Sequence, residues 1–137
     1  EVAGVNEPDD SDNGGAMANW LPVVKAHQTK LYDAVKGDTA TKGIPVGLGA
    51  LRWANSNKWV ENKAMVEACA GKFDFFNLHF YPGKGSDVLK ELTAAKTEIR
   101  KFYSGPIIIS EGGGTTANMT EAEQARIVSS AVSLTEQ

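Results

Sequence analysis

The feature that most constrains this chain is a fourfold alternation between short apolar stretches and longer segments of helical periodicity. We expect strands at residues 1–5, 44–51, 73–81 and 106–110, and helices at residues 19–35, 58–70 and 120–132, with another helix from Ser86 to near Gly105. Strands that alternate with helices form parallel sheets, because a parallel connection must carry the chain back across the sheet. The sequence therefore predicts an α/β fold built from parallel β/α units.

The clearest of these strands is the aromatic-rich run at residues 73–81, which Pro82-Gly83 ends. Side chains alternate between the two faces of a strand. One face is expected to carry Phe75, Asn77, His79 and Tyr81, and the other Phe76, Leu78 and Phe80.

Two architectures fit four β/α units: a small open sheet, or about half of a (β/α)8 barrel, which typically needs about 250 residues. The chain has 137 residues, opens in a predicted strand and stops in a predicted helix. We expect residues 1–137 to be a single partial catalytic domain, cut from a larger protein at both ends.

Composition limits the kinds of partner. The net charge of -3 offers no basic surface for nucleic acid or an anionic membrane, and the apolar runs are too short to span a bilayer. The chain has two histidines and one cysteine, Cys69, without the spacing of a zinc site, so we expect no metal. We expect Cys69 to be a small buried hydrophobic residue. The residues do not determine the cellular location or the oligomeric state.

Polar side chains stand where the predicted strands end. Asn6 and Glu7 follow the first strand, His79 and Tyr81 end the third, and Ser110-Glu111 ends the fourth. Ligands of parallel α/β folds bind at the carboxyl ends of the strands. If the strands are neighbours, both glutamates therefore face one shared site.

Two carboxylates across one site are what cleavage of a glycosidic bond requires. One delivers a proton to the leaving oxygen, and the other attacks the sugar or activates water, so their surroundings must separate their pKa values. Pro8 is expected to bias Glu7 toward an extended backbone.

Three polar neighbours fit such a site. Asn6 can bind a sugar hydroxyl, His79 can line the floor, and Tyr81 can donate its hydroxyl to an ionised Glu111, which lowers the pKa of that carboxyl.

Four stretches together resemble the second part of the catalytic barrel of the large clan of retaining glycoside hydrolases, which includes cellulases, mannanases and β-xylosidases. They are GVNEPD at residues 4–9, KLYDAVK at 30–36 within a helix that begins at a Trp, FDFFNLHFYPG at 73–83, and PIIISEGGG at 106–114. The resemblance implies a partial (β/α)8 barrel that covers barrel strands four to seven.

The resemblance also implies roles for individual residues. Asn6 would bind the substrate 2-hydroxyl, Glu7 would be the acid/base and Glu111 the nucleophile, while His79 and Tyr81 match a His-x-Tyr pattern whose Tyr bonds the nucleophile. It implies a carbohydrate substrate, a retaining mechanism without cofactors, and secretion as the family habit. The three glycines after Glu111 depart from the family, whose members often carry an aromatic residue there.

The remaining signals are open to more than one interpretation. Trp20 and Trp59 are expected to pack, whereas Trp53 follows the second strand and can stack on a sugar ring. Residues 9–20 begin like a calcium loop but carry Trp20 where the loop needs Glu, and residues 112–117 match a permissive dinucleotide fingerprint. Residues 118–120 are a glycosylation sequon only if the protein comes from a secretory eukaryotic cell. A non-catalytic carbohydrate-binding protein and a small flavodoxin-like, anion-binding domain are the alternative functions.

Overall fold

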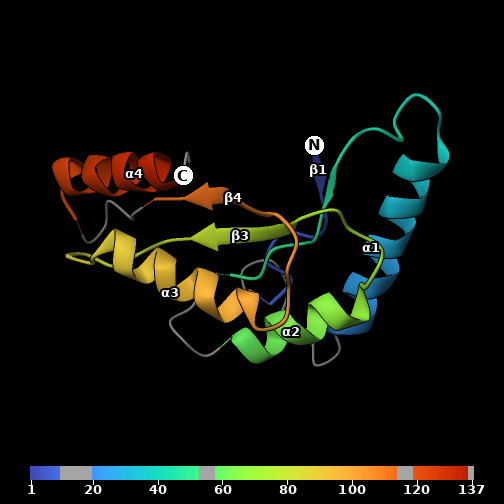
Figure 1. Ribbon diagram of the computed structural model, residues 1–137, viewed down its shortest axis with the longest axis horizontal. Coiled ribbons are helices and arrows are strands. Elements are labelled where there is room, and N and C mark those ends of the chain that lie inside the picture. Colours follow the sequence, from blue (N-terminus) through green and yellow to red (C-terminus); the bar gives the residue numbers. More distant parts are fainter. Residues whose placement is uncertain (10–19, 53–57, 114–118, 136–137) are drawn as a thin grey trace.

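A computed structural model describes residues 1–9, 20–52, 58–113 and 119–135 of the chain. The predicted order of four strands and four helices is confirmed (Figure 1). The elements are β1 (Val2–Ala3), α1 (Trp20–Gly37), β2 (Val46–Gly47), α2 (Trp59–Ala68), β3 (Phe76–Phe80), α3 (Val88–Arg100), β4 (Ile107–Gly112) and α4 (Glu121–Thr135).

All strand pairing in the described residues is parallel, as predicted. β1 pairs with β2 and β3 pairs with β4. The two pairs are joined by an isolated parallel bridge between Gly47 and Phe75, and the Leu48 amide donates to the Phe75 carbonyl at 3.0 Å. The α/β class with parallel strands is therefore confirmed, while closure into a (β/α)8 barrel stays a prediction.

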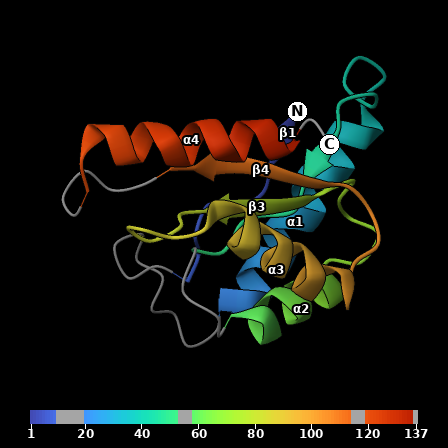
Figure 2. The same ribbon diagram turned by 60° about the vertical axis from the view of Figure 1, so that its left-hand side comes forward.

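The helices follow one another around the strands. In Figures 1 and 2, β3 and β4 run side by side, with α3 beside them and α4 along β4. Each helix contacts the next one along the chain. Neighbours in sequence are thus neighbours in space, which brings the ends of successive strands to the same edge.

Side chains cap the starts of two helices. The Asp87 carboxylate caps α3 by accepting from the Lys90 amide, and the Thr120 hydroxyl accepts from the Glu123 amide at the start of α4. The Glu123 carboxylate accepts from the Gly85 amide and from the Arg126 guanidinium. This contact ties the loop after β3 to α4.

A single apolar core fills the space between the strands and the helices. Its largest fully buried apolar side chains are Phe76, Phe80, Leu48, Met65, Ile99 and Ile127. Trp20 and Trp59 pack against this core as predicted, and Cys69 is buried with a pKa raised by that burial.

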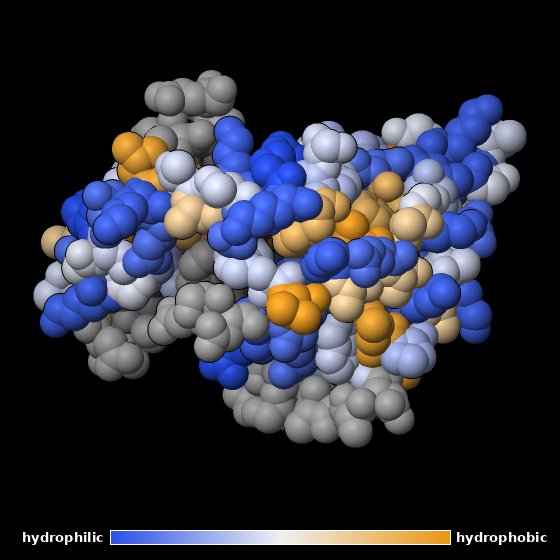
Figure 3. All heavy atoms as spheres, turned by 60° about the horizontal axis from the view of Figure 1, so that its bottom comes forward, coloured by the Kyte–Doolittle hydropathy of each residue, from blue (hydrophilic) through white to orange (hydrophobic). Residues whose placement is uncertain are grey.

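Large aliphatic side chains are exposed on all four helices. On the face in Figure 3, hydrophobic groups lie mainly right of the centre, with hydrophilic groups between and around them. Within the described ranges, no helix combines the length and the apolar character that crossing a membrane requires. The exposed residues are Val23, Val60, Leu89 and Val128.

Glycines let the stretches around and after β1 and β2 pack closely. A Cβ atom at Gly49 would lie 2.6 Å from the Val5 carbonyl oxygen and 2.9 Å from the Val5 nitrogen, and one at Gly47 would meet the Phe75 ring. β2 is shorter than the predicted strand at 44–51, and the chain beyond it pairs through the single bridge between Asn6 and Ala50.

We expect Gly49→Ala to lower the free energy of unfolding by roughly 1–3 kcal/mol, because the clash is with backbone that cannot turn aside. Gly37→Ala is the matched control, since a Cβ there has no neighbour within 4 Å. Chemical denaturation of both variants measures the difference, and equal midpoints would contradict the close approach.

Candidate active site

Glu7 follows β1, which ends at Ala3, in a stretch that is held against the segment after β2. Its amide donates to the Ala50 carbonyl at 2.8 Å, and its φ is +40°. The prediction that Pro8 keeps Glu7 extended is therefore wrong. Such a φ is uncommon outside glycine and is kept only where surrounding contacts enforce it. Here the bond to Ala50 and the side-chain contact to His79 outweigh the local preference.

Glu111 lies within β4 and not after its end, because this strand runs two residues beyond the predicted limit at Ser110. The register of β3 and β4 shifts between Leu78 and His79, so Leu78 pairs with Ile109 and His79 with Glu111. Ser110 is the extra residue of a bulge. Bulges redirect side chains, and this one brings Glu111 opposite His79.

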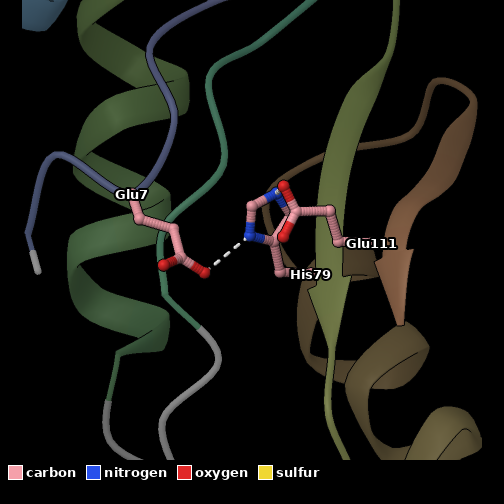
Figure 4. Close-up of side chains that lie close together, drawn as sticks. All are labelled: Glu7, His79 and Glu111. Atoms are coloured by element: carbon pink, nitrogen blue, oxygen red, sulfur yellow. Dashed lines mark hydrogen bonds and ion pairs between the residues drawn. The ribbon is translucent and has the colours of Figure 1, made fainter. Parts of the chain in front are cut away.

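The glutamate–histidine cluster consists of Glu7, His79 and Glu111 (Figure 4). His79 Nδ1 lies 2.7 Å from Glu7 Oε1, and His79 Nε2 lies 3.5 Å from Glu111 Oε1. The side chains are 1% exposed for His79, 16% for Glu7 and 41% for Glu111. His79, predicted to line the floor of the site, thus stands between the two carboxylates.

The tautomer of His79 sets the direction of its contact with Glu7. A neutral imidazole donates through one nitrogen and accepts through the other. With its N–H on Nδ1, His79 donates to an ionised Glu7 across the 2.7 Å contact; with its N–H on Nε2, it accepts there from a protonated Glu7. In both forms this contact orients the side chain of Glu7.

Tyr81 completes the other side of the cluster. Its hydroxyl donates to Glu111 Oε2 at 3.0 Å, which is the predicted contact. Burial is the largest cause that raises the pKa of Tyr81, followed by the hydrogen bond and the charge of Glu111 and then by the charge of Glu7. With Oε2 bound to Tyr81, Glu111 has Oε1 available for chemistry.

The two carboxylates are close. One oxygen of Glu7, one nitrogen of His79 and one oxygen of Glu111 all lie within 4.8 Å of one another. Three such groups can also hold a metal ion. Two ligands of a zinc ion, each bound at about 2.0–2.1 Å, lie more than 3 Å apart in tetrahedral geometry, so the 2.7 Å pair of Glu7 and His79 is a direct hydrogen bond.

The other predicted residues fall outside the cluster. Asn6 is exposed beside Glu7 and pairs through its backbone with Ala50, so its contact with a substrate stays a prediction. Trp53, residues 114–118 of the dinucleotide and sequon motifs, and residues 10–19 of the calcium-like loop lie outside the described residues.

Asp9, the first residue of the calcium-like loop, has both carboxylate oxygens engaged. Oδ1 accepts from the Arg52 amide at 2.9 Å, and Oδ2 binds the ammonium of Lys58. The sequence did not predict these contacts, because their partners are distant along the chain. In the sequence, the only hint that Asp9 supports the site is its position two residues after Glu7.

A small cavity of about 20 Å³ adjoins His79 and has room for about one water or hydroxyl group. The buried Oδ1 of Asn77, which lines it, has no hydrogen-bond partner among the described residues. The cavity is lined by Leu51, Arg52, Lys58, Trp59, Asn62, Asn77, Leu78 and His79.

Comparison with known proteins gives one match. The family model described as glycosyl hydrolase catalytic core matches residues 2–137, which is nearly the whole chain. No curated protein and no solved structure matches it.

We expect Glu111→Gln to lower the pKa of Tyr81, because the substitution removes the negative charge that favours the neutral phenol. Stability from that neutral phenol is complete below the ordinary tyrosine pKa of about 10 and is lost as the pH rises through the higher folded-state value. Ultraviolet titration measures the shift, and Tyr81→Phe identifies the signal among the three tyrosines. An unchanged or higher pKa in Glu111→Gln would contradict the contact.

Proposed function

The chain belongs to the glycosyl hydrolase catalytic core family, and from this premise we propose that it hydrolyses O-glycosidic bonds of a β-linked glycan with retention of configuration. The observation that carries the proposal is the approach of Glu7 and Glu111, whose nearest oxygens lie within 4.8 Å. Glu7 follows β1 and Glu111 lies near the end of β4, and the carboxyl ends of the strands are where parallel α/β folds bind their ligands.

The separation of the carboxylates supports retention over inversion. Retaining glycosidases place their two carboxyl groups about 5–5.5 Å apart, whereas inverting enzymes need about 6.5–9.5 Å to admit a water molecule. The nearest carboxylate oxygens of Glu7 and Glu111 lie within 4.8 Å, which is closer to the spacing of retaining enzymes than to that of inverting ones. This spacing suits direct attack on the sugar by one of the two carboxylates.

In the first step Glu111 Oε1 attacks the anomeric carbon, and the bond from that carbon to the leaving oxygen breaks. Glu7 gives its proton to that oxygen. Glu111 suits the role of nucleophile because it is the more exposed glutamate and because Tyr81 fixes its other oxygen. The products are a covalent glycosyl-enzyme and the released alcohol.

In the second step Glu7, now ionised, takes a proton from water, and the resulting oxygen attacks the anomeric carbon. The bond to Glu111 breaks, and both carboxyl groups return to their starting states. In this half of the cycle, an N–H on His79 Nδ1 donates to the Glu7 carboxylate across their 2.7 Å contact. His79 therefore supports the half of the cycle in which Glu7 acts as a base.

Substrate binding is proposed for two further residues. Asn6 is exposed next to Glu7 and is proposed to bind the sugar 2-hydroxyl. Trp53 follows β2 along the chain and is proposed to stack on a sugar ring, which is a common use of tryptophan in polar clefts.

We expect Glu111→Gln to abolish hydrolysis of aryl glycosides and soluble β-glycans, because an amide is a poor nucleophile. Glu7→Gln is expected to lower turnover roughly 100- to 10,000-fold, the usual contribution of general acid–base catalysis. Glu61→Gln on α2 is the control and should keep wild-type rates. Binding of glycans without turnover in the wild type would instead indicate a carbohydrate-binding protein.

The stereochemistry of the product is a separate prediction. We expect the anomer formed first to have the configuration of the substrate, because two displacements each invert the same carbon. Proton NMR of the anomeric signal during the first minutes of hydrolysis measures this. An initial product of opposite configuration would rule out a covalent intermediate on Glu111.

A further inference from the structure

We propose that Asp9 is a positioning residue for Glu7, which it fixes in place by binding the backbone amide of Arg52 and the ammonium of Lys58. The inference rests on the proposed function, in which Glu7 is the acid/base. Asp9 acts through Glu7 and carries no chemical step of its own.

The first observation is the environment of the Asp9 carboxylate. Its side chain is 10% exposed, and its two oxygens bind groups that lie 43 and 49 residues farther along the chain. A carboxylate removed from water is costly unless charged or polar partners replace the lost hydration. Arg52 and Lys58 provide these partners, so Asp9 fastens the loop after β1 to the segment between β2 and α2.

The second observation is the backbone of Glu7. With φ at +40°, it adopts a conformation that needs support from its surroundings. The Glu7 amide is bound to Ala50 on one side, and on the other side Pro8 offers no N–H donor. Asp9 is the next residue with a fixed contact. The conformation of Glu7 is thus held from both sides, by the contact of its own amide with Ala50 and by the contacts of Asp9 with Arg52 and Lys58.

The third observation connects the anchor with His79. Arg52 and Lys58, the partners of Asp9, line the small cavity whose wall includes His79. Movement of the Asp9 anchor therefore changes the distance between the Glu7 loop and β3. The sensitive contact is the 2.7 Å bond from His79 Nδ1 to Glu7 Oε1.

The kinetic test uses aryl glycosides whose leaving groups differ in acidity. Proton donation by Glu7 matters most for poor leaving groups, and a dinitrophenolate leaves without it. We expect Asp9→Ala to lower kcat/KM roughly 100-fold for 4-methylumbelliferyl glycosides, a typical general-acid contribution, and only a few-fold for 2,4-dinitrophenyl glycosides. A uniform loss across the series would overturn the proposal, because a merely structural role does not distinguish leaving groups.

The second readout needs no activity. The chain has two histidines, His27 and His79, so the imidazole ¹⁵N spectrum of the full chain is simple, and His79→Asn assigns it. We expect Asp9→Ala to shift the His79 resonances, because the Nδ1 contact to Glu7 is lost. Unchanged His79 resonances would overturn the proposal.

Matched variants separate this effect from a general loss of charge. Asp33 on α1 pairs with Lys72 and takes no part in the glutamate–histidine cluster. Asp33→Asn removes its charge and should leave the kinetics and the His79 resonances unchanged. Lys58→Arg keeps the cation and should stay near wild type, whereas Lys58→Met should reproduce part of the Asp9→Ala effect. If Asp9→Ala does not fold, Asp9→Asn and Lys58→Met provide the same two readouts.

The two readouts also separate the two proposals. If the wild type hydrolyses no glycoside while Asp9→Ala still shifts His79, the proposed function is wrong and the positioning of Glu7 by Asp9 stands. If the wild type is active and neither readout responds to Asp9→Ala, the proposed function stands and the role of Asp9 is wrong.

Discussion

The arrangement of the site depends on one buried imidazole that stands between two acids. His79 is 72 residues from Glu7 in sequence, yet its Nδ1 lies 2.7 Å from that carboxylate. β3 is buried along its whole length, so the imidazole of His79 is removed from water and gains from polar neighbours within the protein. Glu7 is hydrogen-bonded to its Nδ1, and Glu111 Oε1 lies 3.5 Å from its Nε2. Satisfying His79 therefore sets the position of both carboxylates and gives them the close spacing on which the proposed chemistry rests.

The backbone provides that spacing through two local irregularities. Gly49 allows the chain after β1 to lie against the chain after β2, which brings Glu7 within reach of β3. The bulge at Ser110 changes the register of β4 so that Glu111 pairs with His79. Regular pairing would have placed Ser110 opposite His79 and turned Glu111 to the other face. The site is thus made by departures from regular structure, which is typical of functional sites.

Much of this fold could be predicted from the sequence, because the signals were local. Apolar periodicity gave the order of the elements, and the cap at Asp87 is encoded within a few residues. The meeting of Glu7 and Glu111 followed from a general property of parallel strands. The φ of Glu7, the bulge at Ser110 and the partners of Asp9 were not predictable, because tertiary contacts between distant segments decide them. Closure of a barrel stays a prediction.

The central claim is that Glu111 forms a covalent bond to the sugar, and a trapping experiment tests it most directly. A 2-deoxy-2-fluoroglycosyl fluoride of whichever sugar the enzyme hydrolyses slows both steps but supplies a good leaving group, so the glycosyl-enzyme accumulates. Mass spectrometry of the intact chain and of its peptides should show one added fluorosugar on Glu111 and none in Glu111→Gln. An enzyme that hydrolyses the parent glycoside but gains no adduct, or carries it on another residue, would contradict the proposed mechanism.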